Sequence, residues 1–124
     1  MNEISYSQRL KVYKRAFERY GQEMQCIVAI EELSECQKEI CKVLRGKGNL
    51  ENLAEEVADA TICLEQVRLM FGLNDMVCHR MDEKVERLFH RITDDMPNIS
   101  KETTAALERM GANAHGGYEQ GVEL

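Results

Sequence analysis

Several residue types that interrupt or shape folds are scarce in this chain of 124 residues. It has no tryptophan, one proline and only 6% aromatic residues. Proline breaks helices, and most of the residues that remain are good helix formers, so the composition favours an all-α fold. The length suffices for one compact domain with a modest core.

The chain also lacks a long apolar run and an excess of positive charge. No segment is apolar enough to cross a membrane, and the N-terminus has no signal-peptide pattern, so we expect a soluble, cytoplasmic protein with no membrane partner. The formal net charge of -6 argues against a nucleic-acid partner, since such binding usually needs a basic face. A small anionic substrate held through a metal ion remains compatible with this charge.

The five cysteines form no C-x-x-C pair, and their number is odd. This pattern is not typical of a disulfide framework or a zinc site. We interpret them as reduced cysteines of a helical core.

Apolar periodicity predicts four helices, separated by breaks that contain glycine. They span about residues 5–20, 22–44, 49–71 and 75–92, with Asn49 placed to cap the third. Pro97 then ends the pattern, and residues 100–110 are predicted to form one more short helix.

The same pattern predicts two regions. Residues 1–95 form the helical domain, and residues 96–124 form a C-terminal extension with the short helix and a glycine-rich, mobile tail.

Two carboxylate pairs lie beside the apolar stripes of the second and third predicted helices. Glu32 and Glu35 flank one stripe, Glu56 and Asp59 flank the other, and each pair has the same position relative to its stripe. If these helices pack antiparallel, both pairs border one cleft. Converging carboxylates favour a hard cation, and all-oxygen ligation favours Mg²⁺, with Mn²⁺ as the alternative.

A third acidic pair provides a contrast. Glu83 and Glu86 point away from the apolar stripe of their helix, which is typical of a solvated face. Surface charges supported by neighbours one turn away remain the alternative interpretation of the first two pairs as well.

The fourth predicted helix carries a row of basic residues along one flank of its stripe. The row consists of Arg80, Lys84, Arg87 and Arg91. Cations for phosphate oxygens, close to carboxylates for a metal, are what metal-assisted phosphoryl chemistry requires. The alternative is a basic face whose long side chains simply reach into water.

The ordered combination of these motifs resembles the MazG-like, all-α nucleoside triphosphate pyrophosphohydrolases, whose signature is EExxE followed, after a spacer, by ExxD. The sequence EELSE at 31–35 matches the first part, EVAD at 56–59 matches the second, and a K-x-x-R-L pattern follows at 84–88. The resemblance covers about residues 13–92. It implies a bundle of four to five helices, completed by oligomerisation into a homodimer or homotetramer.

The resemblance also implies a reaction: Mg²⁺-dependent hydrolysis of (deoxy)nucleoside triphosphates to the monophosphate and pyrophosphate, as in nucleotide-pool house-cleaning. It assigns metal ligation to Glu32, Glu35, Glu56 and Asp59, phosphate contact to Lys84, Arg87 and Arg91, and contact with the base or sugar to Gln25. Glu35 is the candidate general base, because its pair partner suffices as a direct ligand. Many members have asparagine two residues before the lysine, where this chain has Asp82, so no phosphate contact is carried over there.

Three other functions stay open at this point. The chain could be a non-catalytic helical interaction module, whose stripes serve oligomerisation and whose charges serve solubility. It could be a dUTP or dCTP specialist with the same fold. It could also bind nucleotide without hydrolysing it, although the presence of all four expected carboxylates disfavours that function.

Overall fold

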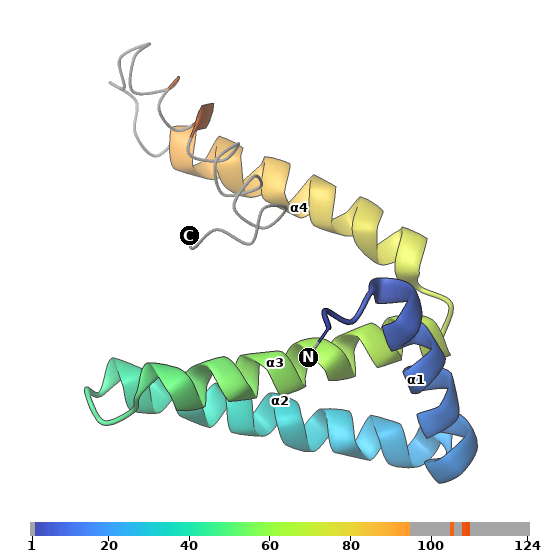
Figure 1. Ribbon diagram of the computed structural model, residues 1–124. Helices are drawn as coiled ribbons and strands as arrows, with labels where there is room; N and C mark the ends of the chain where they lie inside the picture. Colours follow the sequence, from blue (N-terminus) through green and yellow to red (C-terminus); the bar gives the residue numbers. More distant parts are fainter. Residues whose placement is uncertain (1, 95–104, 106–107, 110–124) are drawn as a thin grey trace. The chain divides into compact units, whose positions relative to one another are not determined.

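Four helices account for nearly all of the residues that the computed structural model describes, which are 2–94, 105, 108 and 109. The helices are α1 (Tyr6–Tyr20), α2 (Gln22–Leu44), α3 (Leu50–Met70) and α4 (Asn74–Asp94) (Figure 1). These residues contain no strand, which confirms the all-α prediction. The chain divides after Cys78 into two compact parts, residues 1–78 and 79–124.

The helix ends lie within two residues of the predicted ones. Asn49 caps α3 as expected, because its Oδ1 accepts the backbone N–H of Asn52 at 2.8 Å. At the start of α1, the Ser5 hydroxyl accepts the N–H of Gln8 at 3.2 Å, and the Gln8 side chain accepts the N–H of Ser5 at 2.7 Å. This reciprocal capping box satisfies two donors that would otherwise lack partners.

The predictions for the C-terminal extension fall mostly outside the described residues. Of the predicted short helix at 100–110, only Ala105, Glu108 and Arg109 are described, and all three are helical. The boundary at residue 95 and the tail therefore stay predictions.

Two glycines shape the connections around α2. Gly21, between α1 and α2, has φ 87°, a backbone conformation that residues with a side chain rarely adopt. In the loop after α2, a Cβ at Gly48 would lie 2.9 Å from both Cγ2 and the backbone N of Val43. The loop of residues 45–49 therefore packs directly on the last turn of α2, where only glycine fits.

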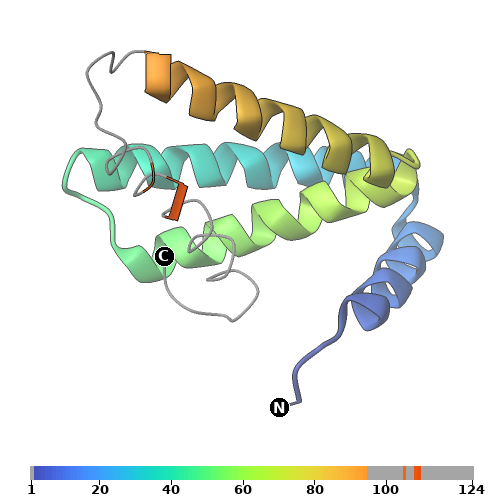
Figure 2. The same ribbon diagram turned by 90° about the horizontal axis from the view of Figure 1, so that it is seen from above.

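Helices α2 and α3 form an antiparallel pair joined by this short loop, and they lie side by side in both views (Figures 1 and 2). The buried apolar residues of this pair are small: Ala29, Ala60 and Cys63. Small side chains let the two helices approach closely along the seam.

The predicted apolar stripes are only partly covered within the chain. On α2, Leu33, Ile40 and Leu44 are 40%, 45% and 83% exposed, and Val57 and Leu64 of α3 are 45% and 47% exposed. The line of contact between α2 and α3 lies to one side of each apolar stripe, toward the carboxylates. Much of the apolar surface of both helices is therefore exposed.

The prediction of core cysteines holds only in part. All five thiols are free, as expected, but Cys63 is the only fully buried one, whereas Cys41 and Cys78 are exposed.

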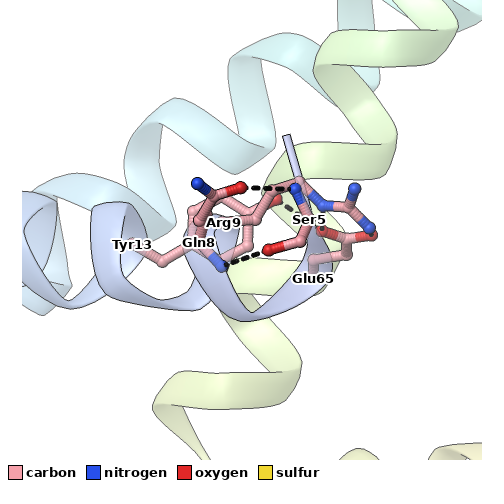
Figure 3. A network of polar contacts seen from close by, with 5 residues as sticks. All are labelled: Ser5, Gln8, Arg9, Tyr13 and Glu65. Atoms are coloured by element: carbon pink, nitrogen blue, oxygen red, sulfur yellow. Dashed lines mark hydrogen bonds and ion pairs between the residues drawn. The ribbon is translucent and has the colours of Figure 1, made fainter. Parts of the chain in front are cut away.

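Helix α1 is held against α3 by a polar network at the end of the pair remote from the loop (Figure 3). The buried hydroxyl of Tyr13 donates to Glu65 Oε2, and Arg9 Nε contacts the same oxygen at 3.2 Å. Burial raises the pKa of Tyr13 to about 12, and the hydrogen bond to Glu65 and its negative charge add to the shift. Tyr13 is therefore a permanent donor at neutral pH.

None of the described helices combines the length and apolar character that a membrane-spanning helix needs.

Candidate metal centre

Three of the four predicted metal ligands come together at the seam of α2 and α3. Glu32 extends from α2, and Glu56 and Asp59 extend from one side of α3, one turn apart. One carboxylate oxygen from each residue lies within 4.8 Å of the other two. Glu32 and Glu56 are half-buried and Asp59 is exposed, so the cluster borders solvent.

The neighbouring carboxylates disfavour ionisation of Glu56. Partial burial raises the pKa of Glu56 above its ordinary value of 4.5, and the negative charges of neighbouring carboxylates raise it further. Those neighbours, in decreasing order of effect, are Asp59, Glu32, Glu35 and Glu39. Four other acidic groups are thus close enough to oppose ionisation of this one carboxyl.

The donor set fits a small, hard divalent ion. Carboxylate oxygens are the ligands that Mg²⁺ and Mn²⁺ prefer. Neighbouring oxygens around an octahedral Mg²⁺ with bonds of about 2.1 Å lie about 3.0 Å apart. The oxygens of Glu32, Glu56 and Asp59, which lie within 4.8 Å of one another, would have to draw closer together to share one such ion.

Glu35, the fourth predicted ligand, lies apart from this cluster. Its Oε1 accepts from Lys38 Nζ at 3.0 Å, and its side chain is 52% exposed. Its charge nevertheless contributes to the raised pKa of Glu56, so it is near the cluster without being part of it. The sequence pattern E-x-x-E does not reveal that Lys38, one turn further along, forms an ion pair with the Glu35 carboxylate.

Glu39 is a further carboxylate near the cluster, and the sequence analysis did not predict it as a site residue. It is only 5% exposed, its Oε2 accepts from Lys42 Nζ at 3.2 Å, and its Oε1 is enclosed without a partner among the described residues. Buried carboxylates are normally fully paired, so this oxygen is unusual. The sequence signal that could have found it is its spacing of seven residues from Glu32, which places both on one face of α2.

Gln25, predicted to contact a base or sugar, is buried, with 9% of its surface exposed. It lies seven residues before Glu32 and therefore on the same face of α2.

The predicted phosphate-binding residues share one face of α4. Lys84, Arg87 and Arg91 line a shallow hollow together with Val85 and Leu88. All three are exposed, and none forms an ion pair with another described residue. They belong to residues 79–124, whereas the acidic cluster belongs to residues 1–78.

The remaining basic and acidic residues of α4 behave as surface charges. Arg80 Nη1 pairs with Glu83 at 2.8 Å, His79 also contacts Glu83, and His90 lies 3.9 Å from Glu86. Among the described residues, Glu83 and Glu86 form ion pairs only within α4, in keeping with the predicted solvated face, whereas Glu32, Glu56 and Asp59 form a cluster that spans two helices.

No protein family model, curated protein or solved structure matches the chain.

Proposed function

We propose that the chain is a Mg²⁺-dependent nucleoside triphosphate pyrophosphohydrolase of the MazG-like type. Its reaction would join water to a nucleoside triphosphate and release the nucleoside monophosphate and pyrophosphate. The observation that carries this proposal is the convergence of Glu32, Glu56 and Asp59 from two helices within 4.8 Å. The motif resemblance supplies the reaction, and the geometry supports the metal site that the reaction needs.

The carboxylates divide into two roles in this proposal. Glu32, Glu56 and Asp59 would hold the metal, which would neutralise charge at the phosphates and promote ionisation of the attacking water. Glu35 accepts the proton of the attacking water, because it lies beside the cluster, keeps half of its side chain in solvent and is not needed as a direct ligand. Phosphate contact by Lys84, Arg87 and Arg91 stays a prediction from the resemblance, supported by their free positive charges.

We further propose that the fold is completed by association of at least two copies. Within residues 2–94, the buried apolar residues are Tyr13, Ala29, Ala60 and Cys63, a small core for four helices. The half-exposed stripes of α2 and α3 offer the apolar surface that a second copy would cover.

The same exposed stripes favour a second candidate, a non-catalytic helical interaction module. In that case the stripes bind partner helices and the acidic residues only keep the surface charged. This candidate predicts neither nucleotide turnover nor an effect of Mg²⁺.

The deciding experiment combines turnover with stability. Pyrophosphate release is measured from a panel of ribo- and deoxynucleoside triphosphates, including dUTP and dCTP, with Mg²⁺ and with chelator. Thermal melts are recorded under the same two conditions. We expect Mg²⁺-dependent release of pyrophosphate and a higher melting temperature with Mg²⁺, since an ion at a hundred times its Kd adds about 2.7 kcal/mol to stability.

A folded protein that turns over no nucleotide and melts at the same temperature with and without Mg²⁺ would contradict the proposal and favour the interaction module. A strong preference for one nucleotide would identify a specialist within the same reaction class.

A further inference from the structure

Polar residues recur every seven positions on both α2 and α3. On α2 they are Gln25, Glu32 and Glu39, which are buried or half-buried, and on α3 they are Asp59, which is exposed, and Gln66, which is buried. Seven residues make nearly two full turns, so each set follows one face of its helix. Polar groups at such positions usually reduce the stability of a helix pair, which makes a functional role the natural reason for them.

The acidic cluster sets the alignment of the two helices. Glu32 and Asp59 meet across the seam, and α2 and α3 run antiparallel on either side of the loop 45–49. Seven residues back from Glu32 and seven forward from Asp59 lead in the same direction, away from the loop, by about 10.5 Å. Gln25 and Gln66 therefore lie at the same level of the seam, as a second polar row.

The side chains of Gln25 and Gln66 are buried, and neither has a hydrogen-bond partner among the described residues. Gln25 and Gln66 are 9% and 8% exposed. Within the described part of the chain, neither side-chain amide makes a hydrogen bond. The fully enclosed atoms without partners belong to Glu39 and Arg68, so both amides keep some contact with solvent.

The chemistry of the row suits the neutral end of a nucleotide. Each amide offers donors and an acceptor, which match the adjacent donor and acceptor on the edge of a nucleobase. The buried residues Ala29, Ala60 and Cys63, which lie between the two rows in sequence, are all small. A charged row and a neutral amide row, about 10.5 Å apart along the helices, correspond to the phosphate and base ends of one ligand.

We propose that Gln25 and Gln66 together bind the hydrogen-bonding edge of the substrate's nucleobase. This inference rests on the proposed function, and it adds Gln66 as a specificity-determining residue that no sequence motif marks. Binding of the base gives both amides partners that the described residues do not supply, so a ligand without a base lacks this gain.

The test is equilibrium binding in the presence of Mg²⁺. The probes are α,β-imido analogues of the common nucleoside triphosphates, which are not hydrolysed to pyrophosphate, and inorganic triphosphate, which has no base. Wild type should bind at least one nucleotide analogue about tenfold more tightly than inorganic triphosphate, the equivalent of one good hydrogen bond. Gln66→Leu should lose that difference and bind inorganic triphosphate as wild type does.

Two further variants separate recognition from folding. Gln37→Leu changes an exposed glutamine of α2 and should bind every probe as wild type does. Gln66→Leu should melt no lower than wild type, because it replaces a buried amide without partners by an apolar side chain of similar size. If it fails to fold, Gln66→Met supplies the same removal of polar atoms.

The outcomes distinguish the inference from the function beneath it. Equal binding of nucleotide and inorganic triphosphate by wild type, or an unchanged base preference in Gln66→Leu, would overturn the inference and leave the metal–phosphate site standing. No binding of any triphosphate with Mg²⁺ would overturn the proposed function, and the inference with it.

Discussion

At the scale of single residues, Glu56 shows how the carboxylates of the cluster act on one another. Burial and neighbouring carboxylates both disfavour its charged form, and its pKa is raised as a result. A carboxyl group whose pKa is higher in the folded than in the unfolded state stabilises the fold when protonated. That contribution is lost as pH rises through the folded-state pKa. At neutral pH, an ionised Glu56 therefore opposes folding unless a cation neutralises it.

Glu56→Gln tests the effect of this charge on stability and on turnover. In chelator near neutral pH, we expect the variant to melt higher than wild type, since a neutral amide of the same shape removes the repulsion. With Mg²⁺, its turnover should fall at least about 100-fold, because loss of a direct ligand costs more than the 10–100-fold typical of outer-shell partners. Glu55→Gln, an exposed neighbour on α3, is the control and should match wild type in both assays. A fully active Glu56→Gln would remove this residue from the ligand set.

The raised pKa also predicts a dependence on pH. In chelator, the difference in melting temperature between Glu56→Gln and wild type should shrink as pH falls toward and below 4.5, the ordinary value for this carboxyl. The reason is that protonation of Glu56 removes the charge that the variant lacks at every pH. Circular dichroism melts over this range measure the difference. A difference that stays constant or grows toward acid pH would show that the charge of Glu56 is not the cause.

At the scale of helices, the attachment of α1 to α3 depends on one tyrosine. Tyr13 is 4% exposed, and its hydroxyl donates to Glu65, which Arg9 also contacts (Figure 3). The contact joins residues 52 positions apart, so it is a tertiary rather than a local interaction.

Tyr13→Phe should lower the free energy of unfolding by about 1–2 kcal/mol, the cost of losing a hydrogen bond to a charged acceptor that keeps some solvent contact. Because the tyrosine pKa is raised from 10.0 to about 12, the stabilisation should be complete below pH 10 and disappear as pH rises toward 12. Urea denaturation compares the variant with wild type. Tyr20→Phe, at a position 62% exposed, is the control, and equal losses in the two variants would exclude a special role for Tyr13.

The positions of the helices could be predicted from the sequence because the information is local. Periodicity, glycine breaks and the cap at Asn49 each act within a few residues, and the observed ends agree with them to within two residues. The partner of Tyr13 could not be predicted, because no local pattern specifies which helix covers a given tyrosine.

In the candidate site too, local patterns could be predicted from the sequence and tertiary contacts could not. Spacing beside an apolar stripe identified Glu32, Glu56 and Asp59, which meet across the seam. It did not identify the ion pair of Glu35 with Lys38 or the burial of Glu39. Both depend on where the seam runs relative to the stripe, and that is decided by the packing of two helices rather than by either one alone.

At the scale of the whole molecule, the exposed apolar side chains are the dominant feature. Leu44 is 83% exposed at the end of α2, in line with the half-exposed Leu33 and Ile40. A continuous stripe of this kind is typical of an interface between subunits.

We therefore expect at least a dimer in sedimentation experiments, and Leu44→Glu should weaken association by placing a charge on the stripe. Val12→Glu is the control, because Val12 is 60% exposed but lies among charged residues of α1, Lys11, Lys14, Arg15 and Glu18. A wild-type protein that sediments as a monomer at all concentrations would contradict this expectation.

The short loop after α2 has a consequence for the order of folding. Both halves of the acidic cluster lie on neighbouring helices, and the loop of residues 45–49 that joins them packs on α2 through Gly48. Contacts between segments close in sequence form quickly, since little chain entropy is lost in bringing them together. The three carboxylates of Glu32, Glu56 and Asp59 therefore meet as soon as this one hairpin closes, whether or not the rest of the chain has folded.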